Sequence, residues 1–95
     1  MLIYISGPVS GISNYKENFL KAKELLESKG FKTLSILDVP CLGEGCFTWS
    51  DCMKVAITLL EKCDKIYLMD GWEQSSGARI EKIWAERMGK GIYVL

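Results

Sequence analysis

The spacing of apolar and polar residues along the chain alternates between the period of a strand and the period of a helix. Short apolar runs bounded by Gly, Pro or Asp predict four buried strands, at 2–6, 31–37, 65–69 and 92–95. Longer segments with apolar residues three or four positions apart predict three helices, at 15–28, 49–62 and 78–88. The stretch 38–48 holds a proline and two glycines, so we expect a loop there.

The order of these elements predicts the fold class. Strands that alternate with helices form a parallel sheet through right-handed crossovers, with helices on both faces. We therefore expect an α/β fold: a small doubly wound, flavodoxin-like or Rossmann-like, four-stranded parallel sheet in a single domain, 1–95. Such sheets bind ligands beyond the carboxyl ends of the strands, where the strand order reverses. Here the turns at Gly7-Pro8, after Leu37 and after Met69 would form that edge.

The first predicted helix has matching start and stop signals. Asn14 is of a type that caps helix N-termini, and Gly30 is of the type that follows helix C-termini. The polar residues between them fall on the face opposite an apolar set, which consists of Tyr15, Phe19, Ala22, Leu25 and Leu26, as in an amphipathic helix.

The third predicted helix carries a carboxylate, Glu81, among apolar residues. On a helical wheel, the apolar arc that we expect to face the sheet consists of Ala78, Ile80, Ile83, Trp84, Ala85 and Met88. A carboxylate on that face is unfavourable unless it is paired, hydrogen-bonded or protonated. Three interpretations follow: a structural ion pair or a rim position, a functional carboxylate facing a cavity, or a helix start misplaced by two residues or more.

The residues just before this helix favour the functional interpretation. Ser75-Ser76-Gly77 would place two hydroxyls and free backbone N–H groups at the helix N-terminus, where anions bind. Serine also caps many helices without binding any ligand. A phosphate at this end and the Glu81 carboxylate one turn further along would bracket a sugar phosphate.

Other candidate contacts lie at the ends of the first and third predicted strands. Ser6-Gly7-Pro8 could touch a ligand or could be a plain strand-ending turn. Asp70 would point from its strand into the proposed site. Trp49 and Trp72 could each stack on a base, although packing in the core or in an interface explains such residues equally well.

Charge and composition argue against several classes of partner, catalytic group and cofactor. The 12 basic and 12 acidic side chains give a net charge of zero, so we expect no nucleic-acid partner. The chain has no histidine, which excludes Ser-His-Asp and Cys-His nucleophile pairs. It has neither a G-x-G-x-x-G fingerprint nor a G-x4-G-K-[ST] loop, so neither a dinucleotide cofactor nor ATP hydrolysis is indicated.

Cysteine spacing bears on metal binding and disulfide formation, and hydropathy bears on where the protein is located. No C-x2-C pair is present, so we expect no metal site and no cofactor. We expect free thiols, with a Cys41–Cys46 bridge as the remaining option. No apolar run approaches the length of a membrane span, and the chain start lacks the features of a signal peptide. A cytoplasmic protein without membrane contact is predicted.

Three segments together carry a family resemblance, and it extends over essentially the whole chain. Residues 3–8, 63–68 and 71–81 resemble the DUF4406 group, which is itself similar to the nucleoside 2-deoxyribosyltransferase and deoxynucleoside 5′-monophosphate N-glycosidase superfamily. In that superfamily a glutamate attacks the anomeric carbon and forms a glycosyl-enzyme ester. The resemblance implies that Glu81 is this nucleophile.

The same resemblance implies further site residues. Ser75 and Gly77 would hold a 5′-phosphate, with Ser76 beside them, and Tyr4 and Gly7 would line the sugar pocket. We add Ser6, Pro8 and Trp72 as candidate ligand contacts and Asp70 as the second catalytic group. The predicted function is cleavage or transfer of an N-glycosidic bond in a nucleoside or nucleotide. The alternative is a non-catalytic module that binds or sequesters a nucleotide in the same cleft.

The size of the chain bears on assembly. The chain is shorter than a typical transferase, and 95 residues are few for enclosing a nucleotide. Superfamily sites are often completed by a neighbouring subunit, so the resemblance implies a homodimer or a higher homo-oligomer.

Overall fold

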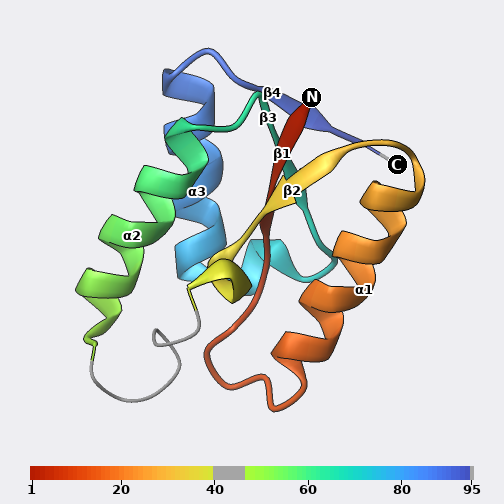
Figure 1. Ribbon diagram of the computed structural model, residues 1–95. Helices are drawn as coiled ribbons and strands as arrows, with labels where there is room; N and C mark the ends of the chain where they lie inside the picture. Colours follow the sequence, from red (N-terminus) through yellow and green to blue (C-terminus); the bar gives the residue numbers. More distant parts are fainter. Residues whose placement is uncertain (40–46, 95) are drawn as a thin grey trace.

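The computed structural model describes residues 1–39 and 47–94 (Figure 1). The elements are β1 (Leu2–Ser6), α1 (Tyr15–Ser28), β2 (Lys32–Leu34), α2 (Trp49–Glu61), β3 (Lys65–Leu68), α3 (Ser76–Arg87) and β4 (Gly91–Tyr93), with 3-10 turns at Ile36–Asp38 and Trp72–Gln74. The four strands form one parallel sheet in the order β2-β1-β3-β4. The predicted α/β fold with a four-stranded parallel sheet is confirmed. The option of a Cys41–Cys46 bridge lies outside the described residues.

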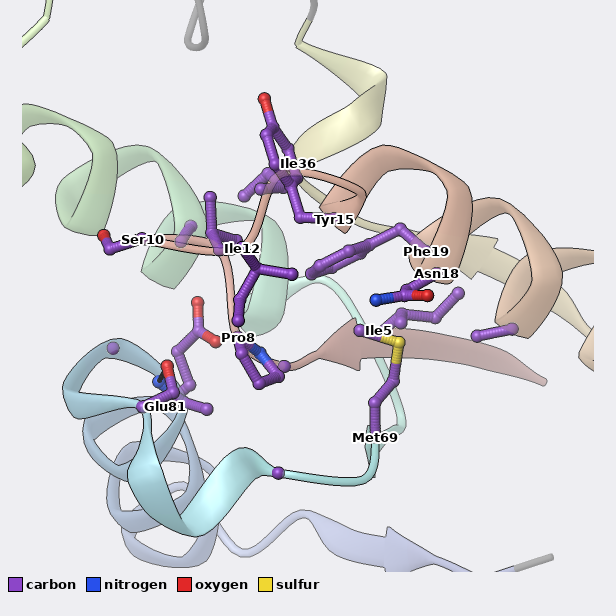
Figure 2. A pocket seen from close by; sticks show the side chains of 18 of the residues that line it. Ile5, Pro8, Ser10, Ile12, Tyr15, Asn18, Phe19, Ile36, Met69 and Glu81 are labelled. Carbon is purple, nitrogen blue, oxygen red and sulfur yellow. Dashed lines mark hydrogen bonds between the residues drawn. The ribbon is translucent and has the colours of Figure 1, made fainter.

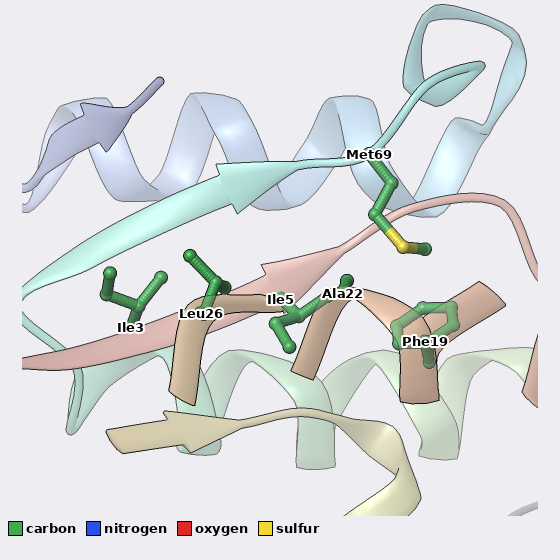
Figure 3. Packing of buried hydrophobic residues seen from close by; sticks show 6 residues of the cluster. All are labelled: Ile3, Ile5, Phe19, Ala22, Leu26 and Met69. Atoms are coloured by element: carbon green, nitrogen blue, oxygen red, sulfur yellow. The ribbon is translucent and has the colours of Figure 1, made fainter. Parts of the chain in front are cut away.

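The helices lie on both faces of the sheet (Figure 1). Helix α1 covers one face, and α2 and α3 lie side by side on the other. The core on the α1 face consists of Ile3, Ile5, Phe19, Ala22, Leu26 and Met69 (Figure 3). The core on the α2 and α3 face consists of Tyr4, Ala56, Leu60, Cys63, Ile66 and Ala85. Successive residues of β1 thus point to opposite faces, as the pleat of a strand requires.

The strand order reverses between β1 and β3, whose crossover helices lie on opposite faces of the sheet. The carboxyl ends of these two strands approach each other closely. The Met69 amide donates to the Ser6 carbonyl at 2.9 Å. A Cβ at Gly7 would collide with the Met69 Cε and would lie 3.0 Å from the Met69 Cβ. A glycine at position 7 therefore leaves room for the Met69 side chain. The reversal of strand order creates a crevice at the carboxyl edge.

The second strand is shorter than predicted. The prediction placed a strand over 31–37, but β2 ends at Leu34 and a 3-10 turn begins at Ile36. The Ser35 hydroxyl accepts the Leu37 N–H at 3.1 Å, and the Asp38 carboxylate accepts the Ser35 N–H at 2.8 Å. This capping box gives the backbone local hydrogen bonds in place of the sheet ladder, and that competition ends the strand.

The ends of α1 agree with the sequence prediction in position and differ in one detail. Asn14 precedes the helix, but its side chain makes no capping hydrogen bond. Gly30 has a φ of 90°, as expected for the residue after a helix C-terminus. None of the described helices is both long and apolar enough to cross a membrane.

The prediction for the buried face of α3 was wrong for its largest residues. Ala78 and Ala85 are buried, but Ile80, Ile83 and Trp84 are 39%, 55% and 46% exposed. The helix begins at Ser76, two residues earlier than predicted, and presents its small residues to the sheet. Alanine lets the helix backbone approach the strands closely, which leaves the bulkier apolar row on the outside.

Candidate functional site

Glu81 is a buried carboxylate held by two hydroxyl groups of β1. Its side chain is 6% exposed and lies in the second turn of α3. The Tyr4 hydroxyl donates to Glu81 Oε2 at 2.7 Å, and the Ser6 hydroxyl donates to Oε1 at 2.5 Å. Tyr4 and Ser6 are two residues apart, so both side chains project from the same face of β1. One strand thus supplies a donor to each carboxylate oxygen.

No cation compensates this carboxylate within the part of the chain that the structure describes, where the ion pairs are Lys21–Glu17 and Lys82–Glu86 on helix surfaces. The interpretation of Glu81 as a structural ion pair or as a rim residue is therefore wrong. Its position on the inner face of α3 is as the helical wheel predicted.

The electrostatics of the site follow from burial. Burial raises the pKa of Glu81, and the hydrogen bonds from Ser6 and Tyr4 oppose that rise. The pKa of Tyr4 is raised well above its ordinary value, mainly by burial and then by the negative charge of Glu81. Tyr4 therefore remains a protonated donor at neutral pH. The two neutral donors thus favour the charged, nucleophilic form of a carboxylate whose charged form burial disfavours.

A cleft of about 1150 Å³ opens at the carboxyl edge of the sheet (Figure 2). Figure 2 shows the Glu81 side chain pointing into this cleft beside Pro8. The predicted site residues that line it are Tyr4, Gly7, Pro8, Asp70, Ser75, Ser76, Gly77 and Glu81. Segments from both ends of the chain thus meet at one edge, as expected for a doubly wound sheet.

Two predicted contacts lie elsewhere. Ser6 is buried behind the cleft and acts on Glu81, without lining the cleft itself. Trp72 is not among the lining residues, and the Lys82 ammonium lies 5.7 Å from the centre of its ring. Within the described residues, Trp72 thus has a cation–π partner on α3 rather than a place in the cleft.

The N-terminus of α3 forms one end of the cleft. The Ser75 hydroxyl oxygen accepts the Ala78 N–H at 3.2 Å, so the predicted cap is present. The N–H groups of Ser76 and Gly77, in the first turn, have no acceptor among the described residues. A Cβ at Gly77 would lie 3.3 Å from the Met53 Sδ, so glycine allows α3 to pack against α2 here. Unpaired N–H groups at a helix N-terminus favour an anion.

Asp70 lies on the turn that follows β3. Its side chain is exposed and lines the cleft. Burial, and to a lesser extent the negative charge of Asp70, raises the pKa of the neighbouring Tyr67. Gly71 has a φ of 85° and turns the chain over Pro8, which lies within 3.3 Å of a Cβ placed there. Asp70 is thus placed where it can reach a ligand in the cleft.

The cleft also contains residues that the sequence did not assign to the site. These include Tyr15, Asn18, Phe19, Met53 and Tyr67. Trp49, which the sequence offered as a possible stacking residue, also lines the cleft. The others come from inner helix faces and strand ends, where core residues and cleft residues share one pattern. The described residues hold no group of three or more Cys, Asp or Glu side chains arranged to bind a metal ion.

Comparisons with known proteins agree with this geometry. The family model described as a domain of unknown function, DUF4406, matches residues 1–94. The structure of the CMP N-glycosidase BcmB from Clostridium botulinum is similar, with a TM-score of 0.65 and 22% identity over 97% of this chain and 68% of that one. A 2-deoxyribosyltransferase from Leishmania mexicana gives a TM-score of 0.70 and 22% identity over 96% of this chain and 61% of the other.

At these identities the likeness shows a shared fold. This chain spans less than two thirds of the length of the transferase. No curated protein matches the sequence significantly.

Proposed function

The chain belongs to the DUF4406 family, and we propose that it cleaves or transfers the N-glycosidic bond of a nucleoside or nucleotide, with Glu81 as the nucleophile. The observation that carries this proposal is the buried Glu81 carboxylate, which lines the cleft and is held by Tyr4 and Ser6. Two proteins of the same fold support it, since one is described as a CMP N-glycosidase and the other as a 2-deoxyribosyltransferase.

The proposed reaction has two steps. A Glu81 oxygen attacks the anomeric carbon of the sugar, and the carbon–nitrogen bond breaks with its electron pair moving to the base. The base takes up one proton as it leaves, and Asp70 is the group we assign to supply it. Water then attacks the anomeric carbon of the glycosyl ester and gives one proton to the Asp70 carboxylate. This step releases the sugar and restores both the Glu81 carboxylate and the protonated Asp70. When a second base attacks in place of water, the same intermediate gives transfer.

The remaining residues of the cleft have supporting roles in this proposal. The Ser76 and Gly77 N–H groups, with the Ser75 hydroxyl, would bind a 5′-phosphate at the N-terminus of α3. Gly7 and Pro8 would contact the sugar. Tyr4 and Ser6 would keep the carboxylate oriented toward the anomeric carbon, because each fixes one of its oxygens.

The test is release of free base, followed by chromatography, from a panel of ribo- and deoxyribonucleosides and their 5′-monophosphates. We expect Glu81→Gln to lower turnover at least about 1000-fold, since loss of a nucleophile removes the covalent route. Glu86→Gln is the matched control, because Glu86 is an exposed carboxylate of the same helix, forms an ion pair with Lys82 and does not line the cleft. Intact-protein mass spectrometry of rapidly quenched reactions should show a sugar adduct on the wild type and none on Glu81→Gln.

Two results would contradict the proposal. Unchanged base release by Glu81→Gln would exclude Glu81 as the nucleophile. Tight nucleotide binding by the wild type, seen as a rise in melting temperature without any product, would instead support the non-catalytic binding module.

A further inference from the structure

The turn between β3 and α3 brings Asp70 to the cleft, and its own backbone closes it. The Trp72 N–H donates to the Met69 carbonyl at 3.2 Å, and the Ser75 N–H donates to the Trp72 carbonyl at 3.0 Å. Within the described part of the chain, the Asp70 side chain makes neither a hydrogen bond nor an ion pair. The place of Asp70 in the cleft therefore depends on how this turn is held against the rest of the protein.

A lysine of α3 contacts the half-buried tryptophan of this turn. The Lys82 ammonium lies 5.7 Å from the centre of the Trp72 ring, within the range of a cation–π interaction. The same ammonium lies 3.0 Å from Glu86 Oε1. The Lys82 side chain is only 27% exposed, although lysine side chains usually extend into water. Lys82 thus connects the turn to the helix by a side chain that is itself largely covered.

Lys82 stands directly after Glu81 in the sequence, and this order gives the contact its place in the site. Successive residues of a helix point about 100° apart. Glu81 lines the cleft, whereas Lys82 and Trp72 are not among the described residues that line it. One turn of α3 therefore directs Glu81 into the cleft and directs its neighbour toward the turn that carries Asp70.

We propose that Lys82 is a positioning residue, which fixes the turn through the Trp72 ring and so keeps Asp70 at a constant distance from Glu81. This inference rests on the proposed function, in which Asp70 protonates the departing base. A general acid must lie within hydrogen-bond reach of the atom that it protonates. A displacement of about 1 Å can lower the rate about 100-fold. Lys82 touches neither the substrate nor the reacting atoms, and it acts only through the turn.

The ion pair with Glu86 is the other role that Lys82 could have. Ion pairs between exposed residues four positions apart on a helix contribute little to stability, and Glu86 is 53% exposed. The two contacts can be separated by substitution. Glu86→Gln removes the ion pair and keeps the contact with the ring, whereas Lys82→Met removes both and keeps a side chain of similar length. Lys82→Arg retains a cation that can stack on the ring.

Fluorine NMR tests the contact without any measurement of activity. The chain has three tryptophans, so labelling with 5-fluorotryptophan gives three resonances, and Trp72→Phe identifies that of Trp72. We expect Lys82→Met to move this resonance toward its position in the unfolded protein, and Lys82→Arg to keep it near the wild-type position. Lys62→Met is the matched control, because Lys62 is exposed and has no ion pair among the described residues. A Trp72 resonance that Lys82→Met leaves unchanged would overturn the proposal.

Kinetics on paired substrates test the effect on Asp70. Each pair joins a nucleotide that the wild type cleaves to its analogue with a better leaving group, made by a 5-fluoro group on a pyrimidine or a 7-methyl group on guanine. Such bases depend less on protonation as they leave. We expect Lys82→Met to lower kcat about 10-fold on the ordinary nucleotide and less than about 3-fold on the analogue, with KM nearly unchanged. Lys82→Arg should restore kcat, and Glu86→Gln should retain it.

The outcomes separate this inference from the proposed function. An equal loss of kcat on both substrates, the same loss in Glu86→Gln, or no recovery in Lys82→Arg would each overturn the positioning role, while base release by the wild type would still support the proposed function. A wild type that releases no base would overturn both the proposed function and the positioning role. Circular dichroism melting establishes that each variant is folded.

Discussion

The two faces of β1 show how one strand serves both stability and chemistry. Ile3 and Ile5 point toward α1 and belong to an entirely apolar cluster. Tyr4 and Ser6 point toward α3 and donate to a buried carboxylate. All four side chains are almost fully buried, so depth does not distinguish the faces. One face buries only apolar side chains, whereas the other buries hydroxyl groups and a carboxylate. Because successive side chains of a strand point to opposite faces, the two sets do not mix.

This comparison indicates that the α3 face is the less stable arrangement of the two. Burying a carboxylate with neutral donors and no cation costs free energy that an apolar pair does not. The raised pKa of Glu81 is the sign of that cost. Functional sites commonly break the rules of packing in this way, while the rest of the domain supplies the stability.

The largest effect on stability is expected on the α1 face. Ile3 is fully buried and does not line the cleft, so Ile3→Ala should lower the free energy of unfolding by about 3 kcal/mol through lost burial and a residual cavity. Chemical denaturation at 25 °C measures the change. Base release per folded molecule should stay unchanged. A loss of activity greater than the loss of folded protein would show that the two faces are not independent.

A smaller effect on stability, with a specific effect on chemistry, is expected for Tyr4→Phe. This change removes the 2.7 Å hydrogen bond to Glu81 and should lower the free energy of unfolding by about 2 kcal/mol at neutral pH. Because this hydrogen bond lowers the pKa of Glu81, its loss should move the acidic limb of the kcat/KM profile to higher pH.

A control for that variant is Tyr93→Phe, since the Tyr93 hydroxyl makes no hydrogen bond among the described residues and the residue does not line the cleft. Tyr93→Phe should leave the pH profile in place. An acidic limb that does not move in Tyr4→Phe would mean that Tyr4 does not tune the carboxylate.

The smallest effect is a gain in stability when the carboxylate loses its charge. Because burial raises the pKa of Glu81 in the folded protein, the wild type loses stability as pH rises through that pKa. Glu81→Gln does not titrate, so its advantage should be small near about pH 4 and should reach about 1 kcal/mol at neutral pH. Thermal melts at both pH values measure it. A variant less stable than wild type at neutral pH would contradict the idea that the charge is costly.

Much of the fold could be predicted because its signals are periodic. The strand and helix periods gave the parallel sheet, and the turns after β1 and β3 gave the edge where the cleft lies. Residue spacing placed Glu81 in one arc with Ala78 and Ala85, which are buried with it. The same arc also held the exposed Ile80, Ile83 and Trp84, so spacing predicted the inner face only in part. The predicted second strand extended too far, although the sequence contains a signal for its early end. Ser35 and Asp38 have the spacing of a capping box, which ends β2 at Leu34.

The partners and the orientations could not be predicted in the same way. Nothing local to α3 shows that its acceptor would meet hydroxyls from β1, because that meeting depends on how the sheet and the helix pack. The exposure of Ile83 and Trp84 was missed for a related reason, since a helical wheel groups apolar residues without showing which of them face the sheet. Small residues decided that orientation, and a large apolar row can serve another surface.

The hydrogen bonds of Glu81 also have a consequence for the order in which the protein matures. Its two donors, Tyr4 and Ser6, precede it by 77 and 75 residues. During synthesis β1 therefore leaves the ribosome long before α3 has been made. Until then, the hydroxyls of Tyr4 and Ser6 lack the Glu81 carboxylate as their acceptor. Contacts of such long range form late in folding. Catalytic activity would then appear only after β1 and α3 have packed together. An activity assay would therefore report on complete folding.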